Sequence, residues 1–245
     1  MNHFEFTGET KVFLGITLKR IKASVSFSTV IKGQIGGWIE KEENLSGNAW
    51  VYDDAQVYGD ARVYGDAWVY DDAQVYGNAQ VYGDAWVYGD ARVYGDARVY
   101  DNAQVYGDAW VYDNAQVYGD AQVYGNAWVY GDAQVSGNAW VYGNAQVSGN
   151  AWVYGNAQVS GNAWVYGDAW EKSPLHIVLT RWSLTVSSKT IITIGCNSFT
   201  VPKWEEKAET IAQKEGMNVD EITEYKLAIQ YAKQWMAIYC KSKED

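Results

Sequence analysis

Few side chains in this 245-residue sequence have the types and spacing that enzyme chemistry requires. The chain has two His, His3 and His176, and two Cys, Cys196 and Cys240, so no site can use several imidazoles or thiolates. The sequence contains no Ser–His–Asp set, metal-ligand cluster or phosphate-binding loop. We therefore expect no enzyme, no catalytic residue, no metal and no cofactor. His176 is expected at the surface, and Cys196 as a buried thiol.

Carboxylates are the chemically active groups that this chain carries in quantity. It has 30 Asp and Glu against 19 Lys and Arg, a net charge of −11. Residues 49–120 hold 13 Asp and 3 Arg, a net charge of 3 − 13 = −10, whereas residues 1–48 sum to +1 and residues 171–245 sum to zero. Coulomb repulsion makes such a chain a poor binder of phosphate backbones, so we expect no direct nucleic-acid binding.

An internal repeat organises the acidic region. From Ala49 to Ala169 an alanine occurs every six residues, and a valine follows two residues later; the unit Ala-x-Val-Tyr-(Gly/Asp)-(Asp/Asn) runs twenty times. Ala and Val two residues apart lie on the same side of an extended strand, and Gly-Asp or Gly-Asn supplies a tight corner. Three units then form one triangular coil of 18 residues. Stacked coils about 4.8 Å apart give a mainly β, parallel β-helix roughly 34 Å long.

The segments on either side of the repeat predict two caps. Residues 1–34 lack the repeat and are expected to form an N-terminal β cap, because repeat arrays need covered ends. Residues 35–171 form the β-helix. Residues 172–245 are expected to form a small α+β domain, a β-hairpin followed by two helices. Pro202 begins the first helix and Gly216 ends it, while Asn218 and Glu221 resemble a capping box for the second.

Residues 18 positions apart are expected to stack, which places aromatic ladders on the outside. One face carries Trp50, Trp68 and Trp86, and another ends with Trp152 and Trp170. Tyr follows Val in 17 of the 20 units, Ser136, Ser148 and Ser160 being the exceptions. These ladders either stabilise the stack or form a contact surface, for which Trp50, Trp68 and Trp86 are the candidates.

Aspartate at the corners is the second candidate binding feature. Turn geometry accepts Asn and Asp almost equally, so the fold does not require Asp there. One interpretation is solubility, and another is calcium binding by clustered carboxylates. The third is an acidic surface for a protein partner, for which the candidates are Asp53, Asp54, Asp60, Asp66, Asp71, Asp72, Asp84, Asp90, Asp96 and Asp108.

The second C-terminal helix carries apolar residues at intervals of three and four. This spacing is typical of a coiled-coil seam, which packs either inside the small domain or against a second copy. The candidates for homo-oligomer formation are Ile222, Tyr225, Ile229, Met236 and Tyr239.

Several motifs resemble hexapeptide-repeat proteins encoded by phages and prophages. They are Gly33-Gln34-Ile35-Gly36-Gly37-Trp38-Ile39-Glu40, Asn48-Ala49-Trp50-Val51-Tyr52, Phe6-Thr7-Gly8-Glu9-Thr10 and Ile194-Gly195-Cys196. The resemblance implies a left-handed hexapeptide β-helix made in a bacterial cytoplasm, and carries over no functional residue.

A broader resemblance is to hexapeptide acyltransferases and γ-type carbonic anhydrases, which place His at subunit interfaces. This chain has no His between residues 4 and 175, and it has Tyr where those repeats have a small residue. Both departures argue against an enzyme of these families.

These observations favour a non-enzymatic acidic solenoid that binds a macromolecule. The first hypothesis is a DNA mimic that occupies the basic surface of a host nucleic-acid-binding or defence protein. The second is a structural module that oligomerises through aromatic ladders and C-terminal helices, and an acyltransferase is a minor third. No apolar stretch reaches about 18 residues, and Met1-Asn2-His3-Phe4-Glu5 does not begin a signal peptide, so we expect no membrane segment and a cytoplasmic location.

Overall fold

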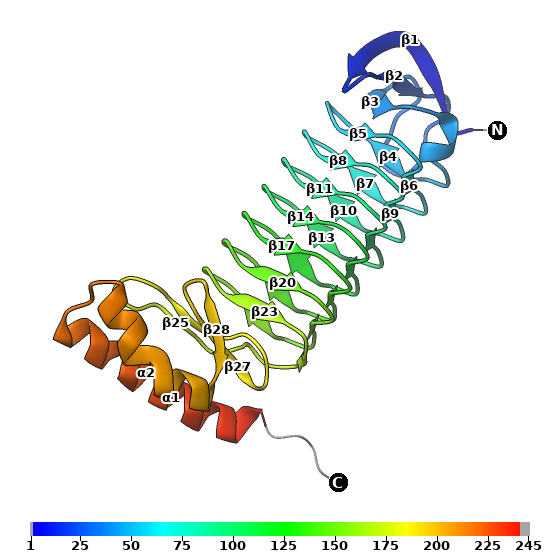
Figure 1. Cartoon of the computed structure of the whole chain (residues 1–245). Coiled ribbons are helices and arrows are strands. Elements are labelled where there is room, and N and C mark those ends of the chain that lie inside the picture. The colour runs from blue at the N-terminus through cyan, green and yellow to red at the C-terminus, as the bar shows by residue number, and fades with distance from the viewer. Residues whose placement is uncertain (1, 241–245) are drawn as a thin grey trace.

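The repeat folds into very short strands, because each unit contributes only its x-Val pair to a parallel ladder. Strand pairs join residues 18 positions apart, such as Trp86 with Gln104 and Val87 with Val105. The computed structural model describes residues 2–240 and shows a parallel β-solenoid of about seven turns, with a hairpin at its N-terminal end and two helices at its C-terminal end (Figure 1). The expected parallel stacking of the repeat is therefore confirmed.

Three sheets run along the solenoid. The first sheet contains β1 (Phe4–Phe13), β2 (Ile16–Ala23), β3 (Ile35–Ile39), β5 (Gln56–Val57), β8 (Gln74–Val75), β11 (Arg92–Val93), β14 (Trp110–Val111), β17 (Trp128–Val129), β20 (Gln146–Ser148) and β23 (Trp164–Tyr166). The second contains β4 (Trp50–Val51), β7 (Trp68–Val69), β10 (Trp86–Val87), β13 (Gln104–Val105), β16 (Gln122–Val123), β19 (Trp140–Val141) and β22 (Gln158–Val159). The third contains β6 (Arg62–Val63), β9 (Gln80–Val81), β12 (Arg98–Val99), β15 (Gln116–Val117), β18 (Gln134–Val135), β21 (Trp152–Val153) and β24 (Ala169–Trp170).

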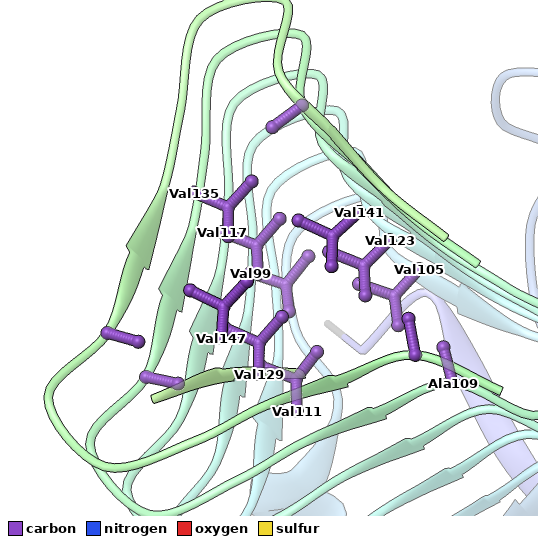
Figure 2. Close-up of a cluster of buried hydrophobic side chains, with 14 of the residues drawn as sticks. Val99, Val105, Ala109, Val111, Val117, Val123, Val129, Val135, Val141 and Val147 are labelled. Atoms are coloured by element: carbon purple, nitrogen blue, oxygen red, sulfur yellow. The ribbon is translucent and has the colours of Figure 1, made fainter. Parts of the chain in front are cut away.

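Alanine and valine fill the interior of the solenoid. Figure 2 shows the Val side chains of the three sheets pointing toward one another in columns, for example Val105, Val123 and Val141. The repeat Ala and Val residues from Ala49 to Val165 are at most 1% exposed. Burying one Val contributes about 1.5–3 kcal/mol, so the columns are the main source of stability.

An N-terminal cap closes one end of the core. Strands β1 and β2 form an antiparallel hairpin, and β3 joins it to the first solenoid coil by pairing with β5. The rings of His3 and Phe27 pack edge-on against Trp50, with centroids 6.1 and 5.6 Å from it. A 3₁₀ turn, Glu42–Asn44, follows, and the buried Asn44 amide donates to the carbonyls of Gly59 and Ala61 at 3.1 and 2.8 Å.

The C-terminal end of the core is closed by a change of register. Ala169 pairs with Trp152, and Trp170 pairs with Val153, a separation of 17 residues instead of 18. A shift of one residue moves a strand side chain to the opposite face. Trp170 is therefore only 5% exposed and lies in the register of the core valines, so its expected place on the outer face is wrong.

Residues after the solenoid form a four-stranded antiparallel sheet and two helices. The strands are β25 (His176–Ile177), β26 (Leu184–Val186), β27 (Ile191–Ile194) and β28 (Asn197–Thr200), paired in that order. The helices are α1 (Val201–Lys214) and α2 (Val219–Tyr239). The α2 capping box is confirmed, because Asn218 Oδ1 accepts from the Glu221 N–H at 2.9 Å and Glu221 accepts from the Asn218 N–H at 2.8 Å.

The apolar seam of α2 packs inside this C-terminal unit. Tyr225, Ile229 and Met236 are 4%, 2% and 9% exposed, and the Tyr225 hydroxyl donates to the Trp182 carbonyl at 3.0 Å. They are therefore wrong as oligomerisation candidates, because these side chains are already buried in the core of the C-terminal unit. Ile222 is partly buried against the same core, and Tyr239 is 51% exposed.

Candidate partner-binding surface

The corners of the solenoid fall into three columns, one between each pair of sheets. The first residue of each corner has positive φ, which Gly adopts without strain. Aspartate replaces Gly there at four positions, Asp53, Asp71, Asp101 and Asp113, with φ between 49° and 59°. Asp71 compensates by bonding along the column, because its Oδ2 accepts from the Gly89 N–H at 3.1 Å.

One column carries an unbroken run of carboxylates. It lies between the second and first sheets, on the turns from β4 to β5, β7 to β8, β10 to β11 and β13 to β14. We call it the acidic edge, and all of its side chains are exposed: Asp53, Asp54, Asp71, Asp72, Asp90 and Asp108.

The charge spacing of the acidic edge can be worked out from the coil repeat. Stacked tyrosine rings of successive coils are 4.8–5.1 Å apart, so four coils occupy about 19 Å. Six carboxylates over about 19 Å give one charge per ~3.2 Å, close to the one charge per ~3.4 Å of a single strand of B-DNA. The edge therefore has the linear charge density of one nucleic-acid strand.

The other two columns separate most of their carboxylates with amides. Asn48 donates to Asp66 at 3.1 Å, and Asn78 donates to Asp96 at 3.0 Å. Asn102 and Asn114 donate in the same way to Asp120 and Asp132, each at 3.0 Å. One of these columns alternates carboxylate and amide, and the other does so except where Asp66 and Asp84 stack directly. The acidic edge instead stacks four carboxylates without an amide between them: Asp54, Asp72, Asp90 and Asp108.

The structure therefore divides the ten predicted acidic residues into two groups. Six form the acidic edge, and the remaining four lie on the other two columns: Asp60, Asp66, Asp84 and Asp96. Asp60 is also paired with the Lys41 ammonium at 2.6 Å, which lowers the pKa of the Asp60 carboxyl. Sorting the corner positions by the 18-residue coil, as the sequence analysis did for the strands, would have separated the two groups.

Local partners compensate part of the acidic edge at its N-terminal end. The Trp38 indole N–H donates to Asp54 Oδ1 at 3.2 Å. The Lys11 ammonium lies 4.5 Å from the Trp38 ring centroid. Burial lowers the pKa of Lys11, and the charges of Asp54 and Asp72 offset part of this shift. Further along, the edge borders an open depression of about 530 Å³ lined by Asp90, Arg92, Asp108, Trp110, Asn126 and Trp128.

The aromatic ladders are packed for stability over much of their length. Successive tyrosine rings stack nearly parallel, 4.8–5.1 Å apart, and several hydroxyls donate to a Gln of the following coil, as Tyr106 does to Gln122 at 3.1 Å. Burial raises the pKa of Tyr58, Tyr70, Tyr94, Tyr100 and Tyr106 to about 12.

The three predicted ladder tryptophans differ in exposure. Trp50 is 0% exposed because the N-terminal cap covers it, so its assignment to a partner-binding face is wrong. Trp68 is half-buried and Trp86 is 43% exposed. Four other tryptophans outside the predicted set are 36–41% exposed: Trp128, Trp140, Trp152 and Trp164.

The histidines and cysteines lie apart from the acidic edge. His176 Nδ1 is 2.9 Å from the buried Thr185 hydroxyl, and burial lowers the pKa of His176. Cys196 is exposed, so its expected burial is wrong. Among residues 2–240 no three His, Cys, Asp or Glu side chains are grouped to hold a metal ion, and no helix is long and apolar enough to span a membrane.

A family model for the YdcK beta solenoid repeat matches the shaft of this chain. The matched segments are residues 55–71, 73–89, 91–107, 103–119, 121–133, 133–149, 145–159 and 157–172. No curated protein matches the chain. With the three parallel sheets, this similarity shows that the chain is a β-solenoid repeat protein.

Proposed function

We propose that this protein is a non-enzymatic acidic solenoid that occupies the nucleic-acid-binding surface of a basic partner protein. The observation that carries the proposal is the acidic edge, with six exposed carboxylates at about one charge per 3.2 Å. A partner that neutralises a phosphate strand with Lys and Arg meets a similar row of charges on this edge. Complementary charge of this kind speeds encounter and selects partners.

The rigidity of the shaft supports the same function. From Asp71 onward each edge carboxylate stands on a corner whose flanking strands pair with the coils on both sides, as β8 does with β5 and β11; at the first corner, β4 pairs only with β7. A preformed row of charges loses little conformational entropy on binding, unlike acidic segments that must become ordered.

The selection of Asp on this edge also has no explanation in the fold. Stacked like charges repel, and Asn continues the same column at Asn126, Asn144 and Asn162. The Asn144 amide donates to Asn162 Oδ1 at 3.1 Å, which shows that neutral residues bond well at these corners.

The test compares two variants with the same change of charge. The edge variant replaces Asp53, Asp54, Asp71, Asp72, Asp90 and Asp108 with Asn. The matched variant replaces six Asp of the other columns with Asn: Asp66, Asp84, Asp96, Asp101, Asp113 and Asp132. Each set includes two residues of positive φ, so the backbone perturbation is equal.

The immobilised wild type and variants are used to capture proteins from a bacterial lysate, and a 20-base-pair duplex is then added as competitor. We expect a basic nucleic-acid-binding protein that the wild type and matched variant retain, that duplex DNA releases, and that the edge variant binds at least tenfold more weakly. Equal retention by the edge variant, or a retained protein that duplex DNA does not release, contradicts the proposal.

A second candidate function is assembly through the exposed aromatics. Trp86, Trp140 and Trp152 are 39–43% exposed, and exposed indole rings are common at protein interfaces. If the protein is an assembly module, sedimentation will show a concentration-dependent oligomer that Trp140→Gln and Trp152→Gln dissociate, and the edge variant will leave it intact.

We also infer the finer classification from the six-residue strand spacing and the motifs that resemble phage hexapeptide-repeat proteins. It is a left-handed, triangular hexapeptide solenoid of phage or prophage origin that acts in the bacterial cytoplasm. A crystal structure with right-handed coils contradicts the handedness. The non-enzymatic role is tested by His176→Ala, which should leave any biological activity of the protein unchanged, and a large loss contradicts that role.

A further inference from the structure

A cavity of about 430 Å³ lies where the last coil of the solenoid meets α2, at the opposite end of the shaft from the N-terminal cap. Its lining includes Tyr154, Trp170, Lys172, Lys189, Trp235 and Tyr239. Its volume is in the range of pockets that hold small molecules. The acidic edge contributes no residue to it, so the cavity is independent of the proposed function.

Aromatic rings form much of the cavity wall. The rings of Trp170 and Trp235 are stacked with centroids 6.4 Å apart and planes at 27°, and the Trp235 and Tyr239 rings are 5.0 Å apart. Trp170 belongs to the shifted strand β24, and Trp235 and Tyr239 belong to α2. The wall therefore forms only because the register shift and the helix bring distant residues together.

One lining residue, Trp170, also carries a hydrogen-bond donor that is buried within the cavity wall and has no acceptor among the described residues. Trp170 is 5% exposed, and its Nε1–H has no partner among residues 2–240. A buried donor left unpaired costs about 1–3 kcal/mol, so a ligand oxygen that reaches it through a small displacement of the Trp170 ring would recover that cost.

The charged residues of the cavity favour an anion. The lining contains Lys172, Lys189 and one carboxylate, Glu171, a net charge of 2 − 1 = +1. A second carboxylate, Asp168, lies outside the lining and accepts from the Lys189 backbone N–H at 2.6 Å. The Lys172 ammonium lies 5.4 Å from the Tyr239 ring centroid. Within the described part of the chain, neither lysine is in an ion pair.

We propose that this cavity binds a small aromatic carboxylate. The planar ring packs against the indole and phenol rings, and the carboxylate faces the two ammonium groups and accepts from Trp170 Nε1–H. The site contrasts with the rest of the shaft, where carboxylates predominate, and no other observation requires cations at this end of an acidic solenoid.

The test uses three probes with one aromatic body and different charge at pH 7: 2-naphthoate, neutral 2-naphthol and cationic 2-naphthylmethylammonium. Calorimetry on the full chain should show that naphthoate binds at least tenfold more tightly than naphthol, and that the cation binds least. The ¹H–¹⁵N resonance of the Trp170 indole, assigned from its loss in Trp170→Phe, should shift on addition of naphthoate.

Variants separate the contributions of charge and donor. Lys172→Gln with Lys189→Gln should remove the preference for naphthoate over naphthol, whereas Lys32→Gln with Lys214→Gln, two exposed lysines elsewhere, should leave it unchanged. Trp170→Phe should weaken naphthoate binding about fivefold. If this variant does not fold, the proposal is tested by the lysine double variant and by the shift of the indole resonance. Equal affinity for the three probes, no binding, or an unmoved Trp170 resonance overturns the proposal.

Discussion

Substitution of one core valine by threonine tests the register of the solenoid most directly. Val123 lies in the middle of the stack, between Val105 and Val141 of the adjacent coils, and is 0% exposed (Figure 2). Threonine has nearly the same shape, so Val123→Thr creates no cavity and only exchanges a buried methyl group for a hydroxyl.

The magnitude follows from two contributions. Loss of the buried methyl removes about 0.8 kcal/mol of transfer free energy. A buried hydroxyl without a partner costs about 1–3 kcal/mol. The neighbouring backbone groups are already paired, since the Tyr124 N–H donates to the Val141 carbonyl at 2.9 Å and the Tyr106 N–H donates to the Val123 carbonyl at 3.0 Å. The free energy of unfolding should therefore fall by about 2–4 kcal/mol.

Urea denaturation followed by circular dichroism measures this difference. The control is Val12→Thr, whose side chain is 74% exposed in β1 and which should change the free energy of unfolding by less than about 0.5 kcal/mol. A value for Val123→Thr that matches this control would refute the reasoning, because Val123 would then not face a dry core.

Three further predictions concern the ladders and the caps. Burial raises the pKa of five stacked tyrosines to about 12, so the unfolded chain loses these protons at a lower pH than the folded protein does. The free energy of unfolding should therefore be constant below pH 10 and fall between pH 10 and 12. Denaturation at a series of pH values measures this change, and phenolate absorbance follows the tyrosines directly. Asn218→Ala removes the α2 cap and should lower stability by about 1 kcal/mol, with Asn218→Ser close to wild type. Burial lowers the pKa of His3, so the stability that neutral His3 gives the N-terminal cap should be present above pH 6.5 and decline as the pH falls. Amide hydrogen exchange near Trp50 should show this pH dependence in the wild type and not in His3→Gln.

The shaft could be predicted from the sequence, because its physical cause is local and repeated. Ala and Val two residues apart must lie on one side of a strand, and a Gly or Asp of positive φ must turn the chain before the next strand. Twenty copies of the same pattern leave one consistent register, so the core, the parallel stacking and the outward residues could be predicted from the sequence. The α2 capping box is local in the same way, and it was predictable for that reason.

The accessibility of the outward residues, and the contacts between distant segments, depend on long-range packing. Trp50 follows the repeat pattern but is buried because residues far away in sequence, His3 and Phe27, pack over it. Trp170 follows the pattern too, yet the last strand pairs with residues 17 positions back instead of 18, which moves Trp170 into the register of the core valines. The α2 seam was equally compatible with a dimer until its packing on the C-terminal sheet was known. Local periodicity specifies the face of a strand, whereas burial at the ends depends on long-range contacts that the period does not encode.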